Sequence, residues 1–342
     1  MSQHQPVASQ SPTPDAGATK SDEAGRSQTR LVLGRFVEHK IALVSIAIVA
    51  FIAVLSSSAV GIGPLSGWWH LSYNQLNPLV DGGAPTMSVV PRWLGGEGLF
   101  LGDHPFGQDR IGKDYFAMTM RGIQNSLTVM LIVGILATVI GTVIGAVAGY
   151  YRGVVDAILM RFTDLIIIIP VIVVGALVGA IASRLGGAID GPVILAILLG
   201  FFTWTTLARL VRGEFFTLRE REYVEAARVA GASDLRIIFK HILPNAIGVV
   251  IVAATLLMAG AILLEVALGF LGLGVRPPDV SLGRLISDNQ SSFATRPWLF
   301  WWPGVFIITL ALCVNFIGDG LRDAFDPRQR RFRPRRANKA LA

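Results

Sequence analysis

The chain has 342 residues, of which 52% are hydrophobic and 15% are charged, and its mean hydropathy is +0.58. Soluble domains carry roughly a quarter of charged residues, so this composition argues against a soluble enzyme and indicates a polytopic membrane protein. The net charge of +7 does not indicate a nucleic-acid partner, because the basic residues stand at the ends of apolar runs and are not interleaved with aromatic residues.

The N-terminal segment differs in composition from the rest. Residues 1–30 are rich in Ser, Gln, Pro, Ala and Thr and have almost no large apolar side chains, which predicts a disordered tail. The first apolar run, Ile41–Ile62, begins too late and is too long for a cleavable signal peptide. Because about 20 helical residues cross a bilayer core, this run is expected to span the membrane. The segment 31–126 then combines this helix with a long extracytoplasmic loop.

Five further apolar runs have interiors almost free of charge, and each is long enough to cross a bilayer. They are Leu127–Ala148, Leu165–Ala182, Pro192–Leu210, Ala246–Leu273 and Phe300–Ile317. We therefore predict an all-α polytopic membrane protein with six transmembrane helices, a core domain at 127–323 and a tail at 324–342. Cys313, the single cysteine, lies in the last run and is interpreted as a small buried hydrophobic residue.

Small residues recur on one face of the second run, at Gly141, Gly145 and Gly149. Such spacing lets two membrane helices approach each other closely. We expect this face to serve packing within the chain rather than a dedicated dimer contact.

The basic residues predict the orientation of the chain. With six spans, the N-terminal tail, the loop 151–161, the loop 212–245 and the C-terminal tail share one side and hold most of the 30 Lys and Arg residues. The positive-inside rule places this side, with both termini, in the cytoplasm. The basic run Arg328–Arg336 is interpreted as a topology anchor near anionic lipid.

A charged segment, residues 222–244, interrupts the apolar runs and is here named the polar island. Residue propensity predicts a helix over Glu220–Ala230, which Gly231 ends in the left-handed conformation. Ser233 fits the N-cap of a second short helix, and Pro244 closes the island before the next span. Its small alanines would allow insertion into a groove of a partner protein. On physical grounds alone, a solvated cytoplasmic loop fits the sequence equally well.

A nucleotide site is not predicted. The sequence has no Walker A motif and no glycine-rich loop between a strand and a helix. If transport by this chain consumes ATP, another chain must hydrolyse it, and no cofactor or metal is expected in this one.

The polar island resembles the EAA loop of ABC importer permeases, written E-A-A-x3-G-x9-I-x-L-P. The matching residues are Glu225, Ala226, Ala227, Gly231, Leu243 and Pro244. His241 stands where the pattern has Ile, as is typical of the peptide and nickel branch. Segments 104–114, 265–274 and 319–328 resemble three further motifs of that branch, so the resemblance covers about residues 31–332.

This resemblance implies a type I ABC importer transmembrane fold and a DppC/OppC-type permease subunit for dipeptides or oligopeptides, located in the bacterial inner membrane. It implies as partners a homologous second permease, two ATPase subunits or domains that bind ATP and Mg, and an extracytoplasmic substrate-binding protein. It also places ATPase coupling in the EAA loop, 219–245. The residues expected to carry this coupling are Glu222, Glu225, Ala226, Ala227, Arg228, Gly231, Ala232, Ser233, His241, Leu243 and Pro244.

Charged residues also stand at the ends of predicted spans. Arg161 and Asp164 are three residues apart near the cytoplasmic end of the third run and are expected to pair; the alternative is contact with the ATPase or an inner gate. Asp319 and Arg322 have the same spacing at a helix end, and pairing within or between helices is expected for them rather than contact with substrate.

Glu265 is an acid inside the fifth apolar run, about 20 residues from its cytoplasmic end. Intramembrane acids usually serve function, so an outer gate or the substrate path is one reading. The other is a hydrogen bond from the helix end into the following Gly-rich turn.

Several other functions compete with peptide import. The same machinery would import nickel, glutathione or another small solute if its binding protein selected it. A secondary transporter or channel acting alone would need coupling carboxylates near the midplane or broken helices, and the mid-membrane positions are nearly free of acids. A scaffold or sensor would use the polar island for docking without transport.

Overall fold

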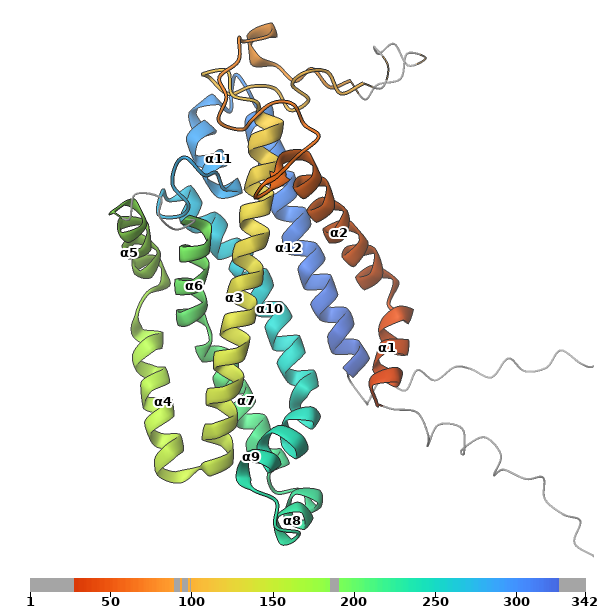
Figure 1. Ribbon diagram of the computed structural model, residues 1–342, viewed down its shortest axis with the longest axis vertical. Coiled ribbons are helices and arrows are strands. Elements are labelled where there is room, and N and C mark those ends of the chain that lie inside the picture. The colour runs from red at the N-terminus through yellow and green to blue at the C-terminus, as the bar shows by residue number, and fades with distance from the viewer. Residues whose placement is uncertain (1–27, 89–92, 94–97, 99, 185–190, 326–342) are drawn as a thin grey trace, which may run out of the picture.

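The computed structural model of the protein describes residues 28–88, 93, 98, 100–184 and 191–325 (Figure 1). The tails predicted at 1–30 and 324–342, with the basic run Arg328–Arg336, lie almost entirely outside the described residues. Within them the chain is mainly helical, with one antiparallel hairpin in which Gly61 pairs with Ser66 and Ile62 with Leu65.

The elements follow one another in an order that alternates long helices with short connections. In chain order they are α1 (Gln28–Glu38), α2 (Lys40–Val60), β1 (Gly61–Ile62), β2 (Leu65–Ser66), η1 (Asp81–Gly83), α3 (Tyr115–Tyr151), α4 (Gly153–Ile168), α5 (Val171–Arg184), α6 (Gly191–Thr203), α7 (Thr205–Leu218), α8 (Glu222–Val229), α9 (Asp234–Arg236), η3 (Ile237–Ile242), α10 (Leu243–Phe270), α11 (Leu282–Asn289), η4 (Gln290–Ser292) and α12 (Trp298–Phe325).

Four helices of the described chain are long and apolar enough to cross a membrane: α2, α3, α12 and the continuous helix Asp234–Phe270. Two more crossings are bent pairs, α4 with α5 at 71° and α6 with α7 at 40°. If each pair crosses once, the chain has six spans, which agrees with the predicted number.

The third span begins earlier than predicted, and the loop expected at 151–161 is wrong. α3 ends at Tyr151 and α4 starts at Gly153, so only a tight turn at Arg152, with φ 58°, separates them. The start of the apolar run does not mark the start of this helix, because α4 also contains polar residues. Ion pairs to α7 hold these polar residues within the helix.

The same span is also broken in its interior. Ile169 has extended dihedrals (φ −76°, ψ 115°) and precedes Pro170, where the predicted run Leu165–Ala182 had been expected to continue as one helix. A proline disfavours the helical conformation of the residue before it, which accounts for the break.

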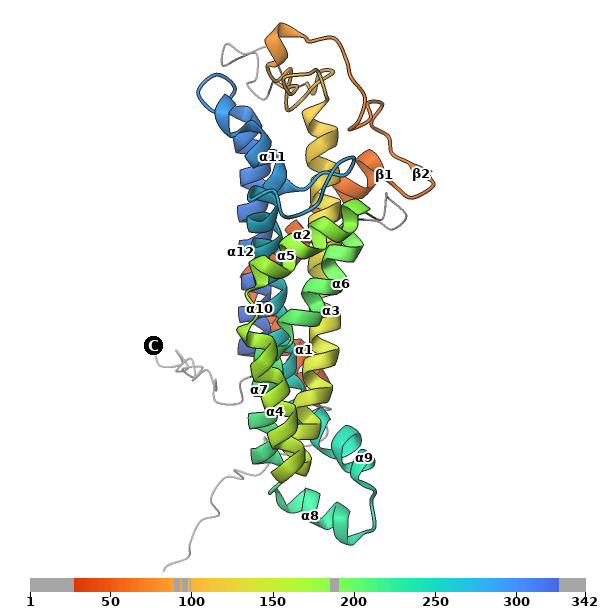
Figure 2. The same ribbon diagram turned by 90° about the vertical axis from the view of Figure 1, so that its left-hand side faces the viewer.

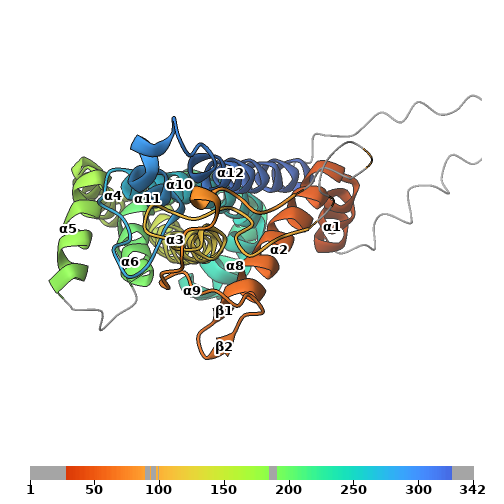
Figure 3. The ribbon, with the colours of Figure 1, turned by 90° about the horizontal axis from the view of Figure 1, so that it is seen from above.

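α3 stands at the centre of the bundle, with α4, α5 and α6 on one side and α1 and α2 on the other (Figure 3). It contributes buried side chains to every hydrophobic cluster of the described chain. Figure 2 shows the segment after β2 and helix α11 at one end of the bundle, and α8 and α9 at the other.

The glycine face of α3 packs against α7, as predicted. A Cβ on Gly141 would lie 2.8 Å from the Trp204 carbonyl oxygen, and one on Gly145 would lie 2.4 Å from that of Ala208. A Cβ on Gly149 would meet the Phe215 side chain at 2.6 Å. The two backbones therefore approach too closely for larger residues, and the stripe serves packing within the chain.

Candidate functional site

The polar island projects beyond the bundle at one end, where α8 and α9 form a small lobe (Figures 1 and 2). α8 ends in a Schellman motif: the Ala232 N–H donates to the Ala227 carbonyl and the Gly231 N–H to the Arg228 carbonyl, both at 3.0 Å. Gly231 has φ 81°, which a side chain would strain. The predicted left-handed end of this helix is thus confirmed.

The second half of the island is different from the prediction. Ser233 occupies the N-cap position, but its side chain makes no capping hydrogen bond. The chain then continues without a stop through α9 and the π-helical segment η3 into α10, so Pro244 does not close the island. The π geometry, in which the Leu243 N–H donates to the Ile238 carbonyl, allows proline to stand in the first turn of α10 without ending the helix.

This continuity has a mechanical consequence. Asp234 and Phe270 are the ends of one 37-residue helix, so a displacement of the island reaches the far end of the span along a rigid rod. A flexible link would absorb such a displacement.

Apolar contacts seat the island on the bundle. Val224 is the only buried residue of α8, and it packs in one cluster with Ile237, Ile238 and Ile242 of η3 and with Tyr150 and Phe215 of α3 and α7. Each of the three isoleucines is completely buried. The island is therefore attached through a single side of α8.

The other side of the island is open. Val229 is 85% exposed and Leu235 is 64% exposed, which leaves apolar surface next to charged side chains. Partial burial raises the pKa of the Tyr223 phenol above its ordinary value. Of the predicted coupling residues, Glu222, Glu225, Ala226, Arg228, Gly231, Ser233 and Pro244 are exposed, and Ala227, Ala232, His241 and Leu243 are partly buried.

Polar contacts tie the island, and the residues just before it, to the end of α3. The Tyr150 hydroxyl donates to the Asp234 carboxylate at 2.7 Å, and Arg219 donates to the Tyr150 carbonyl at 2.5 Å. Arg152 donates to Glu220 at 2.7 Å. Sequence reasoning missed these residues, because the partners stand up to 84 positions apart and no local pattern links them.

Arginines of α7 also hold α4. Arg209 pairs with Asp164 at 2.6 Å, and Arg212 pairs with Asp156 through both carboxylate oxygens. The predicted pair between Arg161 and Asp164 is therefore wrong: α7 presents a guanidinium to the carboxylate, and Arg161 remains exposed.

Glu265 is completely buried at the junction of α10 and α3. Its Oε2 accepts a 2.7 Å hydrogen bond from the Ser126 hydroxyl, and its Oε1 has no partner among the described residues. The expectation of a hydrogen bond into the Gly-rich turn is wrong, since the partner lies on α3. A role at an outer gate stays a prediction.

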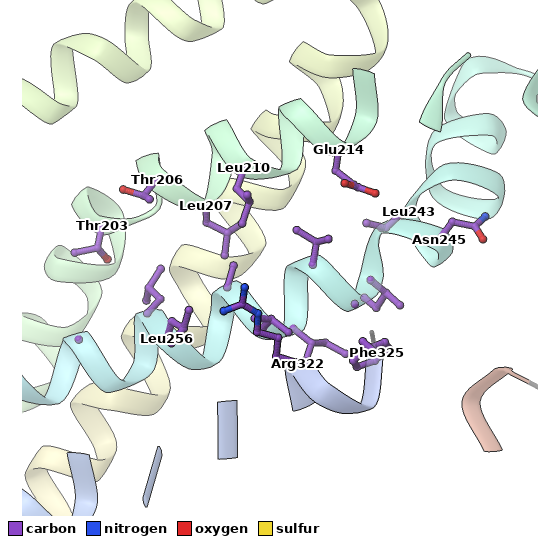
Figure 4. A pocket seen from close by; sticks show the side chains of 18 of the residues that line it. Thr203, Thr206, Leu207, Leu210, Glu214, Leu243, Asn245, Leu256, Arg322 and Phe325 are labelled. Atoms are coloured by element: carbon purple, nitrogen blue, oxygen red, sulfur yellow. The ribbon is translucent and has the colours of Figure 1, made fainter. Parts of the chain in front are cut away.

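A groove of about 1710 Å³ begins at the base of the island and runs between α7 and α10, past the end of α12 (Figure 4). Leu243 and Pro244, predicted as coupling residues, lie in its wall. Arg322 also lies in the wall, while Asp319 is exposed, and no ion pair joins these two in the part of the chain that the structure describes. Their predicted pairing is wrong because the arginine is directed into the groove.

Comparison with known proteins bears on this arrangement. Residues 141–331 match the family model described as "Binding-protein-dependent transport system inner membrane component". The chain is 36% identical over 309 residues to the oligopeptide transport system permease protein OppC of Mycobacterium tuberculosis (strain H37Rv), covering 90% of this chain and 97% of the relative. It is 34% identical over 311 residues to OppC of Escherichia coli K12, covering 91% and 95%.

Among solved structures, the chain is similar to a chain of the MetNI methionine ABC transporter, with a TM-score of 0.50 and 20% sequence identity. The match covers 61% of this chain and 96% of that chain. At this level of identity the likeness concerns the fold alone, and it agrees with the type I importer fold that was expected.

Proposed function

Because the chain belongs to the family of binding-protein-dependent transport system inner membrane components, we propose that it moves oligopeptides into the cytoplasm. It is the inner-membrane permease component of an ABC importer. The observation that carries the peptide substrate is the identity to oligopeptide permeases over about nine-tenths of the chain. Family membership argues against a secondary transporter acting alone and against a scaffold. Two spans are bent, as the broken helices of secondary transporters are, but this feature does not outweigh the family match.

The polar island is the proposed docking surface for an ATPase partner. It projects from the bundle, its outer side exposes Val229 and Leu235, and Glu222, Glu225 and Arg228 are also exposed on α8. Exposed apolar side chains together with charged ones are typical of protein interfaces. ATP and Mg would be bound by two ATPase subunits or domains, and the island side of the membrane would be the cytoplasm.

The other proposed partners follow from the family. A homologous second permease would complete the pathway, and an extracytoplasmic binding protein would deliver substrate at the end that carries α11. The groove beside α10 reaches the island, because Phe239, Leu243 and Pro244 line it, and this supports a pathway for substrate leaving on the same side as the ATPases.

Transmission from the island to the groove would use two connections. The first is the rigid helix Asp234–Phe270, which contributes Leu243 and Pro244 to the wall of the groove. The second is the Tyr150–Asp234 hydrogen bond, which joins the same helix to α3. Closure of the ATPases would therefore move α10 and α3 together and change the width of the groove.

The test is uptake by the assembled importer. The complex of both permeases, the ATPases and the binding protein is reconstituted in proteoliposomes, and entry of labelled tetrapeptide, nickel and glutathione is measured with and without ATP. ATP-dependent peptide entry is expected. Nickel or glutathione entry without peptide entry would contradict the peptide substrate and leave the permease role intact.

A further inference from the structure

The groove beside α10 contains charged residues of both signs on different elements. Glu214 extends into it from α7, and Arg322 extends into it from α12, as Figure 4 shows; Arg35 of α1 is a second base in the wall. Most of the wall between them is apolar and comes from α7 and α10, with Leu210 and Leu256 as examples. An acid and a base therefore share one cavity, separated by hydrophobic surface.

Neither charge is neutralised by the described chain. No hydrogen bond or ion pair of the described residues involves Glu214 or Arg322. The neighbouring arginines of α7 behave differently, because Arg209 and Arg212 both pair with carboxylates of α4. Glu214 is partly buried and Arg322 is exposed, so both charges are available to a ligand that enters the groove.

The ligand that matches is a zwitterion with an extended body. Resting on the peptide transport proposed above, we propose that the groove is a substrate-contact site in which Glu214 binds the terminal ammonium of a peptide and Arg322 binds its terminal carboxylate. A guanidinium binds a carboxylate through two parallel hydrogen bonds, and a carboxylate accepts strongly from an ammonium.

The size and polarity of the groove fit a short chain. Its volume of about 1710 Å³ exceeds the roughly 300–1,000 Å³ of sites for single small molecules. Thr206 and Asn245 lie in the wall and offer oxygen atoms to peptide N–H groups, while the leucines accept side chains of any sequence. Recognition of the two ends alone would admit peptides of varied composition.

The experiment compares capped and free peptides in the complete reconstituted importer. One tetrapeptide is used in three forms (free, N-acetylated and C-amidated), chosen so that the binding protein binds all three. Glu214→Gln should reduce uptake of the free and amidated forms about tenfold and leave the acetylated form at the wild-type rate. Arg322→Gln should reduce uptake of the free and acetylated forms and spare the amidated form.

Arg276→Gln is the matched control, because Arg276 is an exposed charge outside the groove wall. It should transport all three forms as the wild type does. Subunit content and ATP hydrolysis are measured for each variant, so that a folding defect is recognised; if a Gln variant does not assemble, Glu214→Ala and Arg322→Ala are used, with the same selectivity expected.

Three results would overturn the assignment. Equal slowing of all three peptides, or no slowing, would show that the charges do not bind peptide ends. Loss of the second permease from either variant complex would show that the groove is filled by that subunit. A wild-type importer that takes up no peptide would overturn the proposed function as well, which distinguishes the two failures.

Discussion

The Tyr150 hydroxyl at the end of α3 donates a 2.7 Å hydrogen bond to the carboxylate of Asp234, the first residue of α9. Tyr150 is also buried in the cluster that holds Val224 and Ile238. One side chain thus joins the central helix of the bundle to the helix that runs from the island through the membrane. The island is consequently connected to two spans, and its movement has a structural route into the core.

Removing this hydroxyl should weaken the coupling between ATP hydrolysis and transport without unfolding the protein. Tyr150→Phe keeps the buried ring and loses one hydrogen bond, a cost of about 1 kcal/mol. The number of peptides imported per ATP hydrolysed should fall while membrane insertion is unchanged. Tyr151→Phe is the control, since the Tyr151 ring is 44% exposed and no hydrogen bond of its hydroxyl is found among the described residues. Equal ratios for both variants would contradict the role of Tyr150.

A side chain at the turn of the island should be strained. Gly231 has φ 81° and open space around its Cα, so Gly231→Ala meets no atom yet costs about 1 kcal/mol in backbone strain. We expect weaker ATPase binding and lower uptake, measured by co-purification and transport. Gly213→Ala is matched, because Gly213 is helical and also has open space, and alanine there should be neutral or stabilising.

Reversal of charge at the exposed side of the island should separate hydrolysis from transport. Glu225 is exposed on α8, so Glu225→Lys changes the proposed docking surface without disturbing the buried cluster. Peptide uptake should fall severalfold, while the permease pair assembles normally and resists heat as the wild type does. Undiminished uptake would exclude Glu225 from the docking surface.

The contact between α3 and α7 should tolerate no added methyl group. Gly145→Ala places a Cβ 2.4 Å from the backbone oxygen of Ala208, which forces the helices apart at a cost of roughly 1–3 kcal/mol. The midpoint of thermal unfolding in detergent should fall. Gly304→Ala in α12 has nothing within 4 Å and should leave that midpoint unchanged. Equal stability of both variants would show that the helices can separate freely.

The two ion pairs between α4 and α7 should contribute differently to the stability of the protein. The side chains of Arg212 and Asp156 are 31% and 15% exposed, whereas those of Arg209 and Asp164 are 50% and 43% exposed. Exposed pairs contribute about 0–1 kcal/mol, and a less exposed pair leaves a costlier charge behind when one partner is removed. Asp156→Asn should therefore lower the unfolding midpoint more than Asp164→Asn, and the opposite order would contradict this ranking.

Local features were predictable because their causes are local. Six crossings, with each bent pair counted as one, followed from the apolar runs; the end of α8 followed from Gly231, and the glycine face of α3 from the spacing of Gly141, Gly145 and Gly149. The coupling loop was recognisable because its residue types and spacing lie within one continuous segment. A helix end, a close approach and a membrane crossing each depend on residues that are neighbours in the chain.

Partner choice was not predictable, because it depends on which helices meet. Asp164 had a suitable cation three residues away, yet it pairs with Arg209, 45 positions later. Glu265 had a Gly-rich turn beside it, yet it accepts from Ser126 on α3. The chain order of residues thus decides where this protein crosses the membrane and which segment faces a partner. Only the packing of α3, α4, α7 and α10 decides which charges are paired and which, as with Glu214 and Arg322, are left to face the groove, because electrostatic and hydrogen-bond energies depend on distance in space.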